Sequence, residues 1–426
     1  MNIATKLNFN YNMRMIKNRK DSKFLYSSQF ALWLRGFAIV FFCLLLSSCT
    51  GQQQSLSRSN SQKLILGADR TEVYLPLLNG KQVGIVANPT SVLNKVHLVD
   101  TLLSLQVNIG CVFAPEHGFR GEAEAGETVV AGVDYKTGVK VFSLYGDHKK
   151  PTAESLKGIE VLVFDIQDVG ARFYTYINTL QYVMEAAAKY NLPLIVLDRP
   201  NPHGNYCDGP ILDTIERSFV GLQQIPIVHG VTIGEYAKML NGEFWLTDSL
   251  QCNLQVISML NWDRNKIYNL PIPPSPNLPN DRAIRLYPSL CLFEGTNVSL
   301  GRGTDLPFQC YGFPNNPNGN FEFTPRSISG KSKHPPLENT LCKGYDLSKS
   351  ELNLPNQRIE LKWLLNAWNS FPDRSKFFLP FFDKLAGNHI LKQQISAEWS
   401  EEKIRASWVG GLKKYALIRS KYLIYP

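Results

Sequence analysis

Five short runs of apolar residues, separated by polar or helix-compatible stretches, constrain the fold of this chain more than any other feature. They span residues 83–87, 109–113, 139–143, 161–165 and 194–198. Four of the five are almost continuously apolar, which is typical of strands buried on both faces of a parallel sheet. Residues 176–190, between the last two runs, are compatible with a helix. The sequence therefore predicts an α/β fold with a Rossmann-like, mainly parallel sheet.

A proline-rich stretch follows this region. Residues 271–279 hold five prolines and must form a loop, because proline lacks the backbone N–H that regular structure needs. The sequence beyond it is rich in Gly, Pro, Asn and aromatic residues, with a helical stretch at about residues 360–369. We therefore expect a Rossmann-like domain over residues 63–285 and a smaller, mixed α/β C-terminal domain over residues 286–426.

The first 48 residues have the pattern of a bacterial lipoprotein signal peptide. Basic residues precede an apolar run at residues 37–46, which is too short for a stable membrane span, and Ser47 and Ser48 stand directly before Cys49. We expect cleavage before Cys49, lipidation of this cysteine, and a polar tether over residues 49–62. The alternative is an uncleaved membrane anchor. The pattern predicts an exported protein, anchored by its lipid to the cell envelope and facing the periplasm.

Composition excludes several classes of protein. Residues 1–48 hold seven Lys or Arg and one Asp, so the totals of 45 basic and 36 acidic residues fall to 38 and 35 in the mature chain. This small excess argues against a nucleic-acid partner. Besides Cys49, six irregularly spaced cysteines remain, and we expect mostly buried free thiols. The chain has no CxxC, HExxH, GxSxG or strand-end GxGxxG motif, so we expect no metal and no cofactor.

Polar residues of catalytic type follow four of the five predicted strands. In an open parallel sheet, the loops beyond the carboxyl ends of the strands form the binding crevice. Each residue alone could cap a helix or start a turn, but together they predict a site. They are Asn88 after the first run, Glu116 and His117 after the second, Asp165 and Asp168 at the fourth, and Arg199 and Asn201 after the fifth.

Glu116 is the strongest candidate for catalysis. It follows apolar residues at a strand end, where partial desolvation would favour the protonated form that a general acid needs. Gly118 and Gly121 give a loop that can bend closely over a ligand. The alternative is a salt bridge from Glu116 to Arg120.

The segment 165–176 combines polar and aromatic side chains at the start of a helix. Such a mixture suits a sugar, which has apolar ring faces and many hydroxyls. Arg172 and Tyr174 are candidates for substrate binding. Asp165 and Asp168 are candidates for a second catalytic carboxylate, although Asp168 could instead pair with Arg172.

Three later residues complete the candidate site. His229 follows the apolar run 225–228 and either binds substrate or is a satisfied core histidine. Glu294 lies in a turn-rich stretch with Arg302, which stands between two glycines. Such an arginine can approach a carboxylate closely and bind it through two hydrogen bonds. The alternative is a structural ion pair of Arg302 with Glu294 or Asp305.

Six stretches carry a resemblance to a known family. The chain resembles the exo-β-N-acetylmuramidases of the NamZ type, glycoside hydrolase family 171, which was long catalogued as a bacterial domain of unknown function. The likeness covers most of the mature chain, and motifs of this length are specific. The matching stretches are residues 84–91, 113–121, 163–176, 198–202, 294–297 and 301–304.

The resemblance implies a hydrolase that releases N-acetylmuramic acid from the non-reducing end of peptidoglycan chains or fragments, in a cleft between two domains. His203 stands where the family pattern has an aliphatic residue, and Leu300 where it has an acidic or polar one. Muramic acid carries a lactyl carboxylate that suits an arginine partner. The candidates for that partner are Arg302, Arg199 and Arg172.

Cleavage requires an acid, for which we choose Glu116, and a second group that activates water or stabilises positive charge at the anomeric carbon. Asp165, Asp168 and Glu294 compete for that role, unless the N-acetyl group of the substrate attacks instead. The alternative function is a lipid-anchored peptidoglycan-binding protein without turnover. A deacetylase or transglycosidase is a third possibility, and the lack of a His/Asp metal cluster counts against the deacetylase.

Overall fold

The computed structural model describes residues 62–121, 132–351 and 357–426. The predicted signal peptide, Cys49 and all of the tether except residue 62 lie outside the described residues. Within the described ranges, no helix combines the length and apolar character that crossing a membrane requires.

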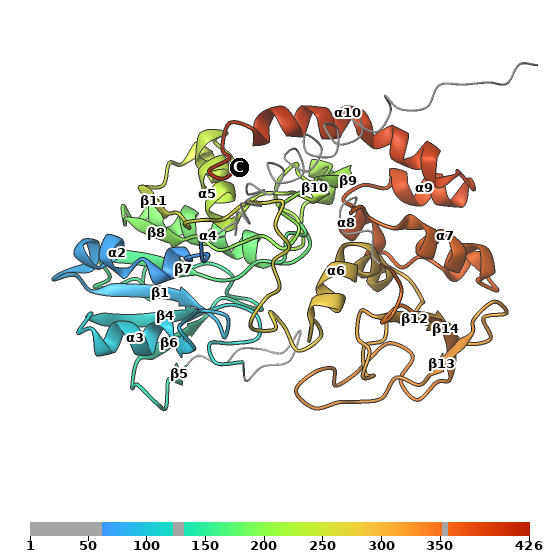
Figure 1. The fold of residues 1–426 in the computed structure, drawn as a ribbon, viewed down its shortest axis with the longest axis horizontal. Coiled ribbons are helices and arrows are strands. Elements are labelled where there is room, and N and C mark those ends of the chain that lie inside the picture. Colours follow the sequence, from blue (N-terminus) through green and yellow to red (C-terminus); the bar gives the residue numbers. More distant parts are fainter. Residues whose placement is uncertain (1–61, 122–131, 352–356) are drawn as a thin grey trace, which may run out of the picture. The chain divides into compact units, whose positions relative to one another are not determined.

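A seven-stranded sheet forms the centre of the N-terminal part, with the strand order β11-β8-β7-β1-β4-β6-β5 (Figure 1). Its strands pair in parallel, except for β5, which is antiparallel to β6. The α/β class and the mainly parallel sheet are thus confirmed, and each of the five predicted strands is present. The strands are β1 Val83–Ala87, β4 Ile109–Ala114, β5 Gly132–Val133, β6 Lys140–Ser143, β7 Val161–Asp165, β8 Leu194–Leu197 and β11 Leu254–Ile257.

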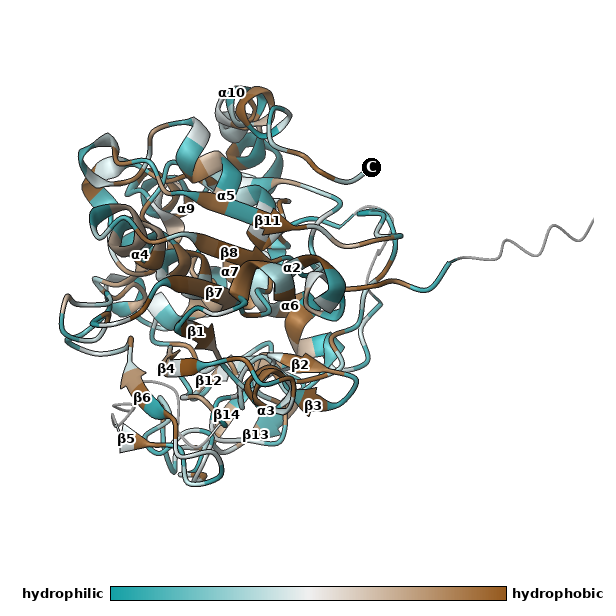
Figure 2. Ribbon diagram, turned by 90° about the vertical axis from the view of Figure 1, so that its left-hand side faces the viewer, coloured by the Kyte–Doolittle hydropathy of each residue, from teal (hydrophilic) through white to brown (hydrophobic). Residues whose placement is uncertain are grey.

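Both faces are covered in the middle of this sheet, which explains why β1, β4, β7 and β8 are almost continuously apolar. Alternate residues such as Ile85 and Val163 pack with α2 (Thr71–Leu78) and α3 (Leu98–Ser104) in one apolar cluster. Their neighbours, such as Val86 and Phe164, pack with α4 (Tyr176–Lys189) and α5 (Ile233–Gly242) in another. Figure 2 shows β1, β7 and β8 as a brown, hydrophobic layer.

The C-terminal part is mixed α/β, as predicted. A three-stranded antiparallel sheet has the order β12-β14-β13 and follows the helix α6 (Asp281–Leu290). Its strands are β12 Cys310–Phe313, β13 Phe321–Phe323 and β14 Cys342–Asp346, followed by α7 Leu361–Ser370, α8 Phe382–Ala386, α9 Ile390–Ser396 and α10 Glu401–Arg419.

One apolar cluster runs through both parts of the chain. It joins residues of β7, α4, α6, α7 and α10, and residues 62–426 form a single compact unit. The predicted domain boundary between residues 285 and 286 therefore stays a prediction. The remaining elements are β2 Val92–Leu93, β3 Val96–His97, β9 Asp208–Ile211, β10 Pro226–Val228 and the 3₁₀ helices Gly67–Asp69, Thr214–Glu216, Thr247–Ser249, Cys291–Gly295 and Arg374–Lys376.

All six cysteines of the described residues are free thiols, as expected. Five of them are buried and Cys207 is half-buried.

Candidate active site

A cavity of about 200 Å³ lies beyond the carboxyl end of β4. It brings together residues from the sheet loops, the start of α4, the proline-rich loop and the α6 region. Five residues that the sequence predicted line it: Glu116, His117, Tyr174, Glu294 and Arg302.

A strained turn directly after β4 presents Glu116 to this cavity. The N–H of Gly118 donates to the carbonyl of Pro115 at 3.0 Å, and His117 has a φ of +71°. This left-handed conformation is uncommon for a residue with a side chain, and it persists only where the surroundings enforce it. Such strain is frequent at functional sites, and here it stands beside the strongest catalytic candidate.

Hydroxyl groups surround Glu116, which is half-buried. The Thr175 hydroxyl donates to Oε2 at 3.3 Å, and the Tyr176 hydroxyl donates to the backbone carbonyl of Glu116 at 3.4 Å. Burial, together with the charge of Glu116 and a hydrogen bond to it, raises the pKa of Tyr145. The contacts from Thr175 and Tyr145 orient the Glu116 carboxyl group, and the contact from Tyr176 holds its backbone.

Aromatic rings form a connected wall of the cavity. The ring of Tyr174 lies 4.9 Å from that of Tyr176 and 5.7 Å from that of Tyr287, which in turn lies 5.0 Å from Phe308, measured between centroids. The Tyr174 hydroxyl donates to the carbonyl of Pro274 in the proline-rich loop at 2.8 Å. This surface is suited to the apolar face of a sugar ring.

Glu294 and Arg302 form an ion pair at the cavity. Arg302 Nε and Nη2 lie 2.7 Å and 2.5 Å from Glu294 Oε1, and the guanidinium also lies 5.0 Å from the ring centroid of Phe308. Burial alone would lower the pKa of Arg302, but the Glu294 carboxylate outweighs it and the pKa is raised. Arg302 thus forms the ion pair with Glu294 that was the alternative to substrate binding. Both side chains nevertheless line the cavity.

A second, apolar cavity of about 420 Å³ also borders the Glu294–Arg302 pair. Leu300, Leu337, Leu379 and Phe381 are among the residues that line it. Leu300 is one of the two departures from the family pattern, and its side chain contributes to the apolar character of this cavity.

Asp165 and Arg199 form a different kind of ion pair, deep behind the strand ends. Arg199 Nε and Nη2 donate to Asp165 Oδ1 at 2.5 Å and Oδ2 at 2.8 Å, and the side chains are 0% and 3% exposed for Asp165 and Arg199. Burial acts to lower the pKa of Arg199, and the Asp165 charge raises it overall. Neither residue lines the cavity, because both side chains are buried behind it.

Asp168 and His229 form a second buried pair that does not line the cavity. Asp168 Oδ2 accepts the N–H of Gly170 at 2.6 Å and lies 3.5 Å from His229 Nε2. His229 Nδ1 accepts the N–H of Val231 at 3.4 Å, so the other ring nitrogen, Nε2, is the one that faces Asp168. The pair stabilises the loops after β7 and β10.

Arg172 connects three segments in the interior. Its fully buried guanidinium donates to the carbonyls of Pro210, Ile225 and Leu385 at 3.1, 2.9 and 2.9 Å. Burial lowers the pKa of Arg172 to about 9. With its hydrogen bonds directed at backbone, Arg172 is not placed to bind a lactyl carboxylate in the cavity.

Asn88 and Asn201 are buried in the loops beside this interior. Asn88 Oδ1 accepts the Thr90 hydroxyl at 2.6 Å. Asn201 accepts the N–H of His203 at 2.7 Å and donates to the carbonyl of Val231 at 2.8 Å. Both asparagines order strand-end loops rather than line the cavity.

Several residues of the cavity were not predicted from the sequence. Tyr145 follows β6, so it obeys the strand-end rule applied to the other four strands, and that signal was available. Tyr287 and Phe308 are distant in sequence from Glu116 and reach it only through the tertiary packing of α6.

The described residues hold no group of three His, Cys, Asp or Glu side chains arranged to bind a metal ion.

Comparisons with known proteins agree with the motifs. Residues 83–282 match the model of the N-terminal part of "Exo-beta-N-acetylmuramidase NamZ", and residues 285–425 match that of its C-terminal part. The peptidoglycan β-N-acetylmuramidase NamZ of Bacillus subtilis (strain 168) is 41% identical over 374 residues, which cover 83% of this chain and 89% of the relative.

Two solved structures of DUF1343 family proteins from Bacteroides fragilis NCTC 9343 are similar to this chain. One is 45% identical with a TM-score of 0.79, and the other is 30% identical with a TM-score of 0.72. Each match covers 85% of this chain and 99% of the solved chain.

Proposed function

The chain belongs to the NamZ family and is a glycoside hydrolase of the exo-β-N-acetylmuramidase class, and we propose that its Glu116 cavity is the active site. The reaction is release of N-acetylmuramic acid from the non-reducing end of peptidoglycan chains or fragments. One observation carries the assignment of the site. Glu116, held by hydroxyl groups, shares one aromatic-walled cavity with the Glu294–Arg302 pair.

In this proposal Glu116 is the general acid that protonates the glycosidic oxygen as the bond breaks. A second group must stabilise the positive charge at the anomeric carbon or activate water. Among Asp165, Asp168 and Glu294, Glu294 alone lines the cavity, so we assign it this role. The aromatic wall of Tyr174 and Tyr287 supports the apolar face of the sugar.

Arg302 is the proposed partner of the lactyl carboxylate. Its Nε and Nη2 engage Glu294, whereas Nη1 has no partner among the described residues. An arginine can present its donors in pairs along different edges of the guanidinium, so it can hold Glu294 and a substrate carboxylate together.

A chromogenic N-acetylmuramide and its N-acetylglucosamine counterpart test this proposal. The chain from residue 63 should release the chromophore from the muramide, and Glu116→Gln should lower turnover about 10²- to 10⁴-fold while it still binds the substrate. Glu154→Gln makes the same chemical change at an exposed position and should keep full activity. If the folded wild-type protein releases neither chromophore, the proposed function is wrong. If Glu116→Gln keeps its turnover, the choice of acid is wrong.

We also propose that the protein is exported and attached to the membrane through a lipid on Cys49, as the N-terminal sequence pattern suggests. Full-length protein should fractionate with membranes, and Cys49→Ser should release it. Membrane association that persists in Cys49→Ser would favour an uncleaved anchor instead.

A further inference from the structure

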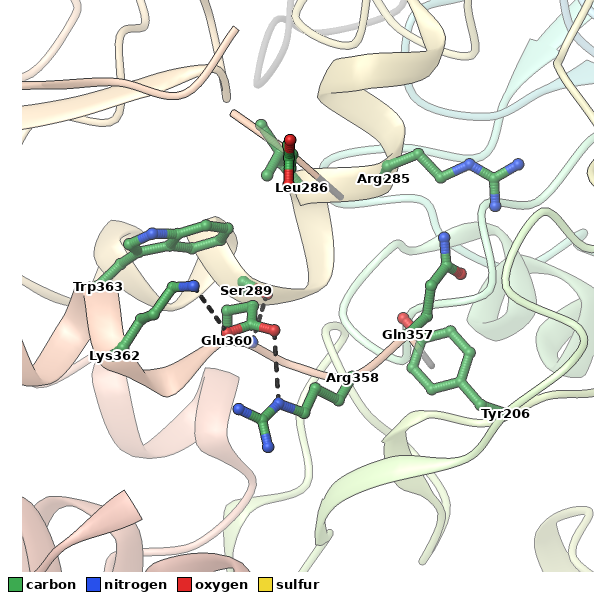
Figure 3. A pocket seen from close by; sticks show the side chains of 10 residues that line it. Tyr206, Arg285, Leu286, Ser289, Gln357, Arg358, Glu360, Lys362 and Trp363 are labelled. Atoms are coloured by element: carbon green, nitrogen blue, oxygen red, sulfur yellow. Dashed lines mark hydrogen bonds and ion pairs between the residues drawn. The ribbon is translucent and has the colours of Figure 1, made fainter. Parts of the chain in front are cut away.

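A groove with a different chemistry lies beside α6, and Figure 3 shows the larger of its two cavities. It consists of two cavities of about 460 Å³ and 330 Å³ that share Arg285 and Gln357. We call it the α6 groove. Tyr287, two residues from Arg285 on the same helix, lines the Glu116 cavity instead. The helix therefore separates the active site from this groove.

The groove has an excess of positive charge. Lys266, Arg285, Arg358 and Lys362 line it, against two carboxylates, those of Glu351 and Glu360. Glu360 lies between two of these cations, with Oε1 3.4 Å from Arg358 Nε and Oε2 3.3 Å from Lys362 Nζ (Figure 3). Glu360 is thus shared by two cations that are each about half exposed, and Arg358 Nη2 also lies 3.6 Å from Glu401 Oε1.

Arg285 is the most buried of the four cations. Its guanidinium donates to the carbonyls of Pro202 at 2.7 Å and Tyr268 at 3.1 Å, and it has no ion pair among the described residues. Burial lowers the pKa of Arg285, and the charge of Asp281 offsets this effect only in part. A guanidinium that faces a cavity in this state favours an anionic ligand, above all a carboxylate.

Rings and amides accompany the cations. Tyr206 and Trp363 line the larger cavity, and Asn205 and Asn265 line the smaller one. Planar rings beside hydrogen-bonding amides suit a saccharide, and the cations add a requirement for negative charge.

We propose that the α6 groove is an accessory binding site for a carboxylate-bearing segment of the cell-wall glycan, occupied while the terminal sugar lies in the Glu116 cavity. This inference rests on the proposed function, since it takes the polymer to be the substrate. The carboxylate comes either from lactyl groups or from the peptide stems, which offer the same chemistry. The groove binds substrate and takes no part in bond cleavage.

The test compares a small substrate with a polymeric one. The double variant Lys266→Glu/Lys362→Glu reverses two exposed charges in the groove and leaves the contacts of Arg285 intact. Lys157→Glu/Lys238→Glu makes the same charge change at exposed lysines outside the groove and serves as the control. Both are assayed on the chromogenic N-acetylmuramide, on peptide-free glycan strands and on strands with peptide stems.

We expect the groove variant to lose roughly tenfold in kcat/KM on strands at low salt, less at high salt, and to match the control on the chromogenic substrate. Loss on both kinds of strand identifies the lactyl carboxylates as the ligand, and loss only on stem-bearing strands identifies the peptide carboxylates. An equal loss on the chromogenic substrate, or strand activity equal to that of the control, overturns the proposal.

Binding of labelled glycan strands, followed by fluorescence polarisation, separates this inference from the proposed function. A wild-type protein that releases no chromophore from the muramide contradicts the function. Strand affinity that is equal in the groove variant and in the control contradicts the groove, whatever the turnover.

Discussion

Two arginine–carboxylate pairs in this molecule have similar chemistry and different surroundings. In each, Nε and Nη2 of an arginine contact one carboxylate, at 2.5 and 2.8 Å in Asp165–Arg199 and at 2.7 and 2.5 Å in Glu294–Arg302. The first pair is 0% and 3% exposed, and the second is 24% and 22% exposed in the same order. Burial, and not the pairing itself, therefore decides which charges remain available to a substrate.

The contacts beyond each pair agree with this distinction. Arg199 engages both oxygens of Asp165 and also donates to the carbonyl of Val92, so its donors are directed at the protein interior. Arg302 contacts only Oε1 of Glu294, and Oε2 accepts the weaker thiol of Cys291 at 3.5 Å. The Asp165–Arg199 pair thus stabilises the fold, and the Glu294–Arg302 pair is placed to contact a substrate.

The largest expected effect is on stability, from removal of the buried arginine. Arg199→Met leaves the Asp165 carboxylate buried without its partner, and we expect the free energy of unfolding to fall by about 3–5 kcal/mol. Arg302→Met, the same substitution in the half-exposed pair, should cost only about 1 kcal/mol. Urea denaturation of both variants measures the difference. Equal losses would break the distinction between the two pairs.

His203 is also fully buried, and its contribution to the free energy of unfolding depends on pH. Burial lowers the pKa of this histidine to about 4, and its Nδ1 lies 2.7 Å from the carbonyl of Val169. Because the folded pKa lies below the unfolded value, the unfolded chain binds more protons between pH 6.5 and 4. The free energy of unfolding therefore keeps its full contribution from His203 above pH 6.5. It decreases as the pH falls, by about 3 kcal/mol at pH 4.

His203→Leu, which restores the aliphatic residue of the family pattern, checks this expectation. The variant should lose less stability than the wild type between pH 6.5 and 4 in parallel denaturation series. Because other buried groups titrate equally in both proteins, the difference isolates His203. Parallel curves would show that the ring is not held neutral.

The difference between buried and partly exposed residues also explains how much of the fold could be predicted from the sequence. β1, β7 and β8 were predictable because every residue in them is buried, so their apolar runs are almost unbroken, and β4 is buried over its last four residues. β6 is exposed or half-buried throughout, and it was predicted from a weaker pattern. β11 was missed because Leu254 and Val256 are only half-buried and Gln255 is exposed. Glu116 and His117 were predictable because every parallel strand ends at the same edge of the sheet.

The roles of the arginines were not predictable from sequence. The partners of Arg172 are carbonyls of Pro210, Ile225 and Leu385, and no local pattern marks a backbone carbonyl as a ligand. Arg199 and Arg302 both stand near acidic residues in the motifs. Only the tertiary packing distinguishes the buried arginine from the one that lines the cavity.

Arg302→Met, in the pair that lines the cavity, should lower kcat/KM for a chromogenic N-acetylmuramide roughly 10- to 100-fold. This is the loss expected when a hydrogen bond between charged groups is removed. Any residual activity on the N-acetylglucosamine counterpart should change less, because that sugar lacks the lactyl carboxylate. Arg302→Lys should restore part of the loss. Equal losses on the two sugars would contradict a contact between Arg302 and the lactyl group.

The smallest effect concerns the hydroxyl groups that hold Glu116. Tyr145→Phe removes one hydrogen bond to this carboxyl group, and we expect kcat to fall about fivefold, with a shift in the pH–rate profile and little change in stability. Tyr135→Phe, at a side chain that is 83% exposed, is the matched control and should behave like the wild type. A merely structural role for Tyr145 would lower the unfolding temperature and leave the pH–rate profile in place. A shifted profile with unchanged stability would instead show that hydroxyl contacts tune the Glu116 carboxyl group. The buried carboxylate of Asp165, in contrast, is held by the charge of Arg199.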